Sequence, residues 1–168
     1  MQRITQWGEY GVHATLFIAR RQAEGAKLVS AQEVSDSQSI SLNYTQQILV
    51  KLREGGIIES ERGPKGGYRL SRDPISITLK DILESSEGDT MSIICEARPL
   101  DMDRCSPEAE CWLRSVWIGL KDSINSYLES ITLDSLLKKM NRSGSVNIVN
   151  LPLSDSSKNP DDKIRVGE

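Results

Sequence analysis

Apolar residues recur at helical spacing in the first third of the chain and predict three helices there. Residues 5–24 are crowded with apolar side chains, as in a largely buried helix. A short second helix is expected after Ser30, because Glu33 follows three residues later and completes the pattern of a capping box. Ser41 precedes the apolar stripe of a third helix, residues 42–54, and is expected to cap it.

The pattern then changes from helical to extended. Residues 57–62 and 68–70 are separated by a turn rich in Gly and Pro, which predicts a β-hairpin. The order of helix, short helix, helix and hairpin is typical of a winged helix-turn-helix, which we expect over residues 1–75. Asp73-Pro74 breaks the chain at the end of this unit.

The rest of the chain predicts fewer elements. Residues 76–111 hold a short linking helix and a loop that carries the cysteines. A long helix is expected over residues 112–140, with a break near 130–133, and its wide apolar stripe favours a homodimer. Residues 141–168 are rich in Ser, Asn, Asp and Pro and predict a disordered tail. The expected fold is mainly α with a small β-hairpin: a winged helix-turn-helix plus a long dimerisation helix.

Charge is distributed unevenly along the chain. The net charge is −3, but residues 1–72 carry ten Lys and Arg against seven Asp and Glu, which favours this half as the partner of a polyanion. The start, MQRITQWGEY, lacks the apolar run of a signal peptide, and no segment is apolar enough for a membrane span. We therefore expect a cytoplasmic protein with reduced thiols.

Polar side chains of the third helix and the hairpin tip are the candidates for DNA contact. The first turns of such a helix enter the major groove, where Asn and Gln pair with adenine edges and Ser, Thr and Tyr suit phosphates. Lys51 and Arg53 lie further along and are expected to reach the DNA backbone at most. The candidates are Ser41, Asn43, Tyr44, Thr45, Gln46 and Gln47 on the helix, and Arg62 and Lys65 on the hairpin for the minor groove.

All three cysteines of the chain, Cys95, Cys105 and Cys111, lie in one short stretch after this DNA-binding unit. In a cytosolic protein such a cluster indicates metal or redox chemistry. Zinc is a candidate, although the spacing does not resemble a zinc finger.

An enzyme is not expected, because the chain has one histidine and no paired catalytic carboxylates. A protein-binding module built on the winged helix is a further alternative.

Four segments together resemble the IscR/NsrR/RsrR superfamily of bacterial transcription regulators. They are the hairpin string Arg62–Leu70, the third-helix string Ile40–Arg53, the start Ile4–Val12, and Cys105–Leu133 with its Cys-x5-Cys spacing. The resemblance covers residues 1 to about 140 and implies homodimers that bind near-palindromic double-stranded operators, many with an iron–sulfur cluster. Gln46 stands where the iron–sulfur biogenesis regulator has a DNA-contacting Glu, which leaves the operator preference open.

The resemblance also suggests where a fourth cluster ligand lies, since such clusters normally take four. The iron–sulfur biogenesis regulator uses a His three residues after its last Cys, but Arg114 occupies that position here and arginine is a poor ligand. The nitric-oxide sensor uses an early carboxylate of the first helix, which matches Glu9. On that pattern all three cysteines and Glu9 would hold a [4Fe-4S] cluster.

The redox sensor of the same superfamily offers the preferred pattern. There a Glu and a His four residues later, from one subunit, join two cysteines of the other subunit on a [2Fe-2S] cluster. The matching residues are Glu9 and His13, which the i, i+4 spacing places on one helix face, with Cys95 and Cys111. Cys105 would then be a spare thiol. A cluster-free thiol switch, in which Cys105 and Cys111 form a disulfide, is the remaining alternative.

Overall fold

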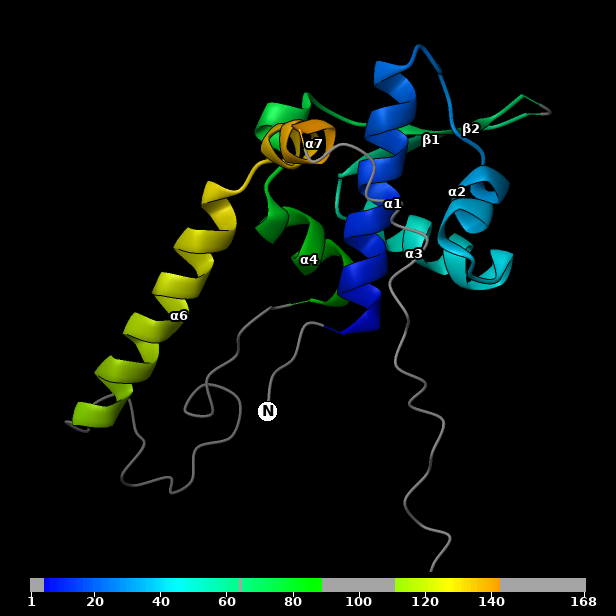
Figure 1. Cartoon of the computed structure of the whole chain (residues 1–168). Coiled ribbons are helices and arrows are strands. Elements are labelled where there is room, and N and C mark those ends of the chain that lie inside the picture. The colour runs from blue at the N-terminus through cyan, green and yellow to red at the C-terminus, as the bar shows by residue number, and fades with distance from the viewer. Residues whose placement is uncertain (1–4, 64, 89–110, 143–168) are drawn as a thin grey trace, which may run out of the picture.

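The computed structural model describes residues 5–63, 65–88 and 111–142. Figure 1 shows α1 at the centre, α2 and α3 on one side, α4 and α7 on the other, and α6 projecting away. Cys95, Cys105 and nearly all of the expected tail lie outside the described residues. The elements are α1 (Gln6–Ala23), α2 (Ala31–Gln38), α3 (Leu42–Glu54), β1 (Ile58–Glu61), β2 (Gly67–Leu70), η1 (Pro74–Ser76), α4 (Leu79–Glu87), α6 (Trp112–Ser130) and α7 (Leu133–Arg142).

The fold is mainly helical with one two-stranded antiparallel hairpin, as the sequence predicts. Its short helices begin at the expected capping residues. Ser30 and Glu33 form a reciprocal capping box at α2, in which the Ser30 hydroxyl accepts from the Glu33 amide and the Glu33 carboxylate accepts from the Ser30 amide. Thr78 and Asp81 form the same box at α4. Each box satisfies two amides that the first helical turn would otherwise leave unpaired.

The hairpin is anchored to the helices at its base. β1 and β2 pair with Ile58 opposite Leu70 and Glu61 opposite Gly67. Val29, between α1 and α2, adds a bridge to Tyr68, because its amide donates to the Tyr68 carbonyl at 2.9 Å and its carbonyl accepts from the Tyr68 amide at 2.8 Å. The tip therefore projects from a base that is fixed to the α1–α2 connection.

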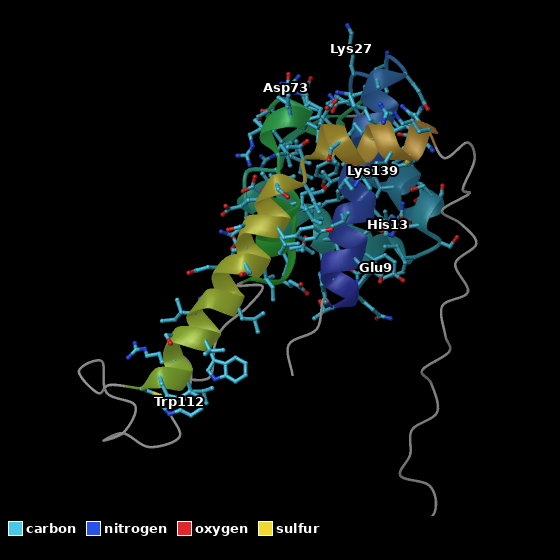
Figure 2. The ribbon with its side chains drawn as sticks, turned by 60° about the vertical axis from the view of Figure 1, so that its left-hand side comes forward. Glu9, His13, Lys27, Asp73, Trp112 and Lys139 are labelled. Carbon is cyan, nitrogen blue, oxygen red and sulfur yellow. The ribbon has the colours of Figure 1, made fainter. Side chains whose placement is uncertain are left out.

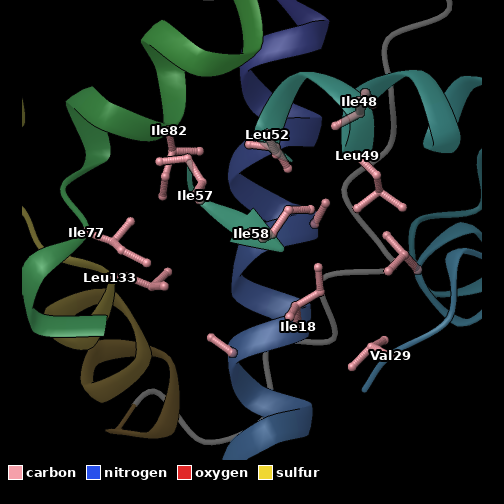
Figure 3. Packing of buried hydrophobic residues seen from close by; sticks show 13 residues of the cluster. Ile18, Val29, Ile48, Leu49, Leu52, Ile57, Ile58, Ile77, Ile82 and Leu133 are labelled. Atoms are coloured by element: carbon pink, nitrogen blue, oxygen red, sulfur yellow. The ribbon is translucent and has the colours of Figure 1, made fainter. Parts of the chain in front are cut away.

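One apolar core lies between α1, α3, α4, α7 and the base of the hairpin (Figure 3). Ile18 of α1 lies at its centre, near Ile58 of β1, and both side chains are essentially inaccessible to solvent. The other fully buried large residues are Val29, Val34, Ile48, Leu49, Leu52, Ile57, Ile77, Ile82, Leu83 and Leu133. This continuous burial ties α3, the expected reading helix, to α1 and α4.

The long helix expected over residues 112–140, with a break near 130–133, is two helices, α6 and α7, and the chain is extended between them at that break. Backbone hydrogen bonds explain the break near residue 131: the Leu79 amide donates to the Ile131 carbonyl, and the Leu133 amide donates to the Ile77 carbonyl, both at 2.8 Å. α7 consequently turns back onto α1 and buries Leu133, while α6 projects outward (Figure 1). Within the described parts of the chain, no helix is long and apolar enough to cross a membrane.

Candidate DNA-binding and metal-binding sites

α3 presents most of its expected DNA-contacting residues to solvent. Asn43, Gln46 and Gln47 are exposed in its first two turns, whereas Ile48, Leu49 and Leu52 point into the core. Ser41 is also exposed and caps the helix, its hydroxyl accepting from the Tyr44 amide at 3.3 Å. The first turn has no acidic side chain. A helix N-terminus without an acidic side chain, beside neutral amides, is a surface suited to DNA.

Two of the expected contacts, Tyr44 and Thr45, do not lie on this exposed face. The Tyr44 ring lies 4.6 Å from that of Trp7 and meets Tyr10 edge-on at 5.7 Å, and burial raises the pKa of Tyr44. Thr45 is 1% exposed and donates its hydroxyl to the Ser41 carbonyl, so the expectation that it suits a phosphate is wrong. Tyr44 therefore holds α3 against α1, and its contact with DNA stays a prediction.

Lys51 is also engaged within the protein. Its ammonium Nζ donates to the backbone carbonyl of Ser86 at 3.0 Å and lies 5.0 Å from the centre of the Trp7 ring. Ser86 is in the last turn of α4, where unpaired carbonyls attract a positive charge. Lys51 therefore joins α3, α1 and the end of α4, a role that the sequence did not indicate.

The hairpin tip carries two cations that are free of ion pairs. Arg62 and Lys65 are exposed, and neither forms a salt bridge or hydrogen bond with any residue in the described ranges. Arg69, lower on the hairpin, differs because its Nε donates to the Glu59 carboxylate at 2.6 Å, which raises the pKa of Arg69. The turn itself requires glycine at Gly63, whose φ is +127°. The tip thus offers two exposed positive charges that no described acidic residue neutralises.

Glu9 and His13, called here the Glu–His pair, lie one turn apart on α1 (Figure 2). The distance from Glu9 Oε1 to His13 Nε2 is 4.0 Å, and the side chains are 58% and 27% exposed. The other ring nitrogen of His13, Nδ1, is buried and has no hydrogen-bond partner in the described chain. A buried imidazole nitrogen without a hydrogen-bond partner costs free energy.

A different face of α1 packs closely on α4. A Cβ atom added at Gly11 would lie 2.0 Å from the Ser86 hydroxyl oxygen, and one at Gly8 would lie 2.9 Å from a methyl of Leu83. The Thr5 amide, at the N-cap of α1, donates to the Glu87 carboxylate at 2.9 Å. The two glycines thus let α1 approach the end of α4 more closely than any side chain would allow.

Cys111 is the one cysteine within the described residues. It is half-buried, carries a free thiol and occupies the N-cap position of α6. Figure 2 shows its neighbour Trp112 at the outer end of α6, away from Glu9 and His13. Across residues 5–63, 65–88 and 111–142, no three His, Cys, Asp or Glu side chains gather as a metal site. The structure therefore brings Glu9 and His13 together, and does not join them to Cys111 within one chain.

α6 has an apolar face that is exposed in the described part of the chain. Leu128 is the sole buried residue among its described positions, whereas Val116 is 55% exposed and Tyr127 is 67% exposed. The exposed apolar residues of α6 are Trp112, Leu113, Val116, Trp117, Ile118, Leu120 and Tyr127. So extensive an apolar surface on one helix indicates a protein interface.

The chain is similar to known transcriptional regulators in both sequence and structure. A family model described as "Rrf2: Iron-dependent Transcriptional regulator" matches residues 4–139. A putative HTH-type transcriptional regulator of Neisseria meningitidis is 34% identical over 147 residues, which cover 88% of this chain and 95% of that protein. The structure is similar to T. potens IscR (TM-score 0.65, 31% identity, 85% of this chain and 91% of that one). It is also similar to CymR, the global cysteine regulator of B. subtilis (TM-score 0.64, 28% identity, 83% and 98%).

Proposed function

Because the chain belongs to the Rrf2 family of transcriptional regulators, we propose that it is a homodimer that regulates transcription through a bound iron–sulfur cluster. The proposed cluster is [2Fe-2S], and the proposed signal is redox state, nitric oxide or iron–sulfur status. The DNA is a near-palindromic operator, since the two half-sites of a homodimer's operator mirror its two-fold symmetry. The observation that carries the proposal is the Glu–His pair on the outer face of α1.

The Glu–His pair suits a cluster that has fewer than four thiolates. Imidazole nitrogen and carboxylate oxygen are both established ligands of iron. The His13 nitrogen nearest Glu9 is Nε2, at 4.0 Å, so Nε2 and the exposed Glu9 carboxylate could bind the same metal. When bound, a [2Fe-2S] cluster with imidazole in place of thiolate would supply a one-electron redox change.

The thiolates are proposed to come from the second subunit. Cys111 begins α6, whose outer end lies away from the α1 of its own chain (Figure 2). A dimer formed along the exposed face of α6 would carry this end towards the partner subunit instead. Cys95 and Cys111 are the proposed thiolate ligands, and Cys105 is left as a spare thiol.

Packing around α1 suggests how the Glu–His pair would influence DNA binding. Trp7 and Tyr10 contact Tyr44 of α3 from one face of α1, and Gly8 and Gly11 hold another face against α4. A change of charge at the Glu–His pair would therefore act on a helix that is packed directly against the reading helix. Because half-site spacing is fixed by the DNA, a small shift of the two copies of α3 would weaken binding strongly.

Two alternatives remain within the same function. A [4Fe-4S] cluster held by Glu9 and all three cysteines would leave His13 without a ligand role. A cluster-free thiol switch is favoured by Cys111, a half-buried free thiol whose side chain makes no hydrogen bond to the start of α6. In that switch Cys105 and Cys111 would each lose a proton and one electron to an oxidant such as a peroxide, forming a disulfide.

The test is the visible spectrum and the iron and sulfide content of the full chain purified without oxygen. We expect coloured protein with about equal iron and sulfide, and a spectrum that His13→Ala changes or abolishes. Arg20→Ala is the matched control, because Arg20 is exposed on the same helix and its side chain contacts Glu24 and the Phe17 ring rather than the Glu–His pair. Colourless wild-type protein under full iron supply would refute the cluster and favour the thiol switch. An unchanged spectrum in His13→Ala would refute the His13 assignment.

A further inference from the structure

Two apolar side chains of α3 are exposed, although the other apolar residues of this helix are buried. Leu42 is 37% exposed and Val50 is 38% exposed, whereas Ile48, Leu49 and Leu52 are inaccessible. Leu42 fits the apolar stripe by spacing, so its exposure is not what the sequence predicts. Both exposed residues lie on the face that the proposed function assigns to DNA.

Leu42, Gln46 and Val50 follow one another at intervals of four residues and form a ridge along α3, called here the 42–46–50 ridge. At 1.5 Å per residue the ridge is about 12 Å long, which corresponds to roughly three or four base-pair steps. The amides of Asn43 and Gln47 lie beside it and are exposed. The ridge therefore presents an amide between two apolar groups over the length of a typical half-site contact.

The charged groups that read G·C pairs are missing from these turns. Guanine is most often contacted by Arg or Lys, and cytosine by Glu or Asp. The first turn of α3 has no acidic residue, and Lys51 is turned towards Ser86 and Trp7. Arg53 stands beyond Val50 in the last turn of α3. What remains are amides, which pair with adenine, and apolar groups, which fit the thymine methyl.

We propose that the 42–46–50 ridge reads a run of A·T base pairs, with Leu42 and Val50 contacting thymine methyl groups and Gln46 contacting adenine. This inference rests on the proposed function, since it assumes that α3 enters the major groove. The hairpin favours the same DNA, because A·T-rich tracts have a narrow minor groove that attracts an unpaired cation such as Arg62. Val50 and Leu42 thereby gain a role in specificity rather than in folding.

The test begins with selection from a random duplex library by the full-length protein. We expect selected half-sites with A·T pairs over three or four consecutive positions. Deoxyuridine is then placed at each thymine in turn, which removes only the methyl group. At a position contacted by Val50, this change should weaken wild-type binding about fourfold, the effect of one lost methylene-sized contact.

The variant Val50→Ala tests whether Val50 is the side chain that contacts the thymine methyl group. This variant should bind a symmetric thymine-containing operator about sixteenfold more weakly, about fourfold for each half-site, and should no longer distinguish thymine from deoxyuridine there. Ile75→Ala is the matched control, because Ile75 is an exposed apolar residue on η1, outside α3. G·C-rich selected half-sites, or no effect of deoxyuridine at any position, would overturn the inference and leave DNA binding intact. If no duplex is selected, the proposed function fails and the inference fails with it.

Discussion

The substitution Lys51→Met distinguishes a role of Lys51 in the stability of the fold from a role in DNA binding. In wild type the ammonium donates to the Ser86 carbonyl at 3.0 Å and lies 5.0 Å from the centre of the Trp7 ring. Methionine keeps much of the apolar stem and removes the charge. A charge-assisted hydrogen bond and a cation–π contact at a partly exposed site together contribute about 1–2 kcal/mol, so we expect Lys51→Met to lower the free energy of unfolding by that amount.

The salt dependence of DNA binding should respond differently to loss of Lys51 and to loss of a lysine in the hairpin. A side chain that neutralises a phosphate changes the slope of log Kobs against log salt concentration by about 0.9, and each subunit contributes once. We expect Lys51→Met to leave this slope unchanged. Lys65→Met is the matched control: Lys65 is exposed and has no recorded partner in the described chain, so its loss should reduce the slope without changing stability. Unchanged urea unfolding with a reduced slope for Lys51→Met would refute the structural role.

Three further changes test other parts of the structure. Gly11→Ala should destabilise the fold by about 1–3 kcal/mol in urea unfolding, because the new Cβ would lie 2.0 Å from the Ser86 hydroxyl oxygen; unaltered stability would contradict the close α1–α4 packing. Val116→Asp should make the chain sediment as a monomer, whereas wild type and Ile75→Asp, whose substituted residue is also exposed, should sediment as the proposed dimer; a dimeric Val116→Asp would argue against the α6 interface. Hydrogen bonds from Ser30 lower the pKa of Glu33, so its contribution to stability is present above its ordinary value of 4.5 and is lost as the pH falls through the lowered pKa. Glu33→Gln should therefore flatten the acid side of the stability–pH curve, and an identical curve would show that the capping box contributes nothing.

The local elements of this fold could be predicted because their causes lie within a few residues. The capping box at Ser30 involves a partner three residues away and is confirmed, and the box at Thr78 has the same spacing. The burial of Thr45 was also visible in principle, since Thr45 precedes the buried Ile48 and Leu49 at helical spacing.

What could not be predicted depends on residues far apart in the chain. Lys51 and Ser86 are separated by 35 positions, so no local pattern reveals their hydrogen bond. The return of α7 onto α1 depends on the bridge between Thr78 and Thr132, which forms only once the chain has folded. The exposure of Leu42 likewise follows from where α3 meets its neighbours, because spacing alone places it with the core.

In the proposed dimer, one cluster is shared between the α1 of one subunit and the cysteine loop of the other. Mixed dimers of His13→Ala and Cys111→Ala chains test it directly through their cluster content. If each site uses His13 from one subunit and Cys111 from its partner, the mixed dimer keeps one intact site and should hold about half of the wild-type iron, whereas each mutant homodimer should hold little.

A second mixed dimer, with both substitutions in one chain, should lose both clusters. When one chain carries both substitutions and the other is wild type, sites shared between subunits are both damaged, so the account predicts almost no cluster. Sites built within single chains would give the reverse: about half of the wild-type iron in the second mixture and almost none in the first. That reverse result would contradict the account.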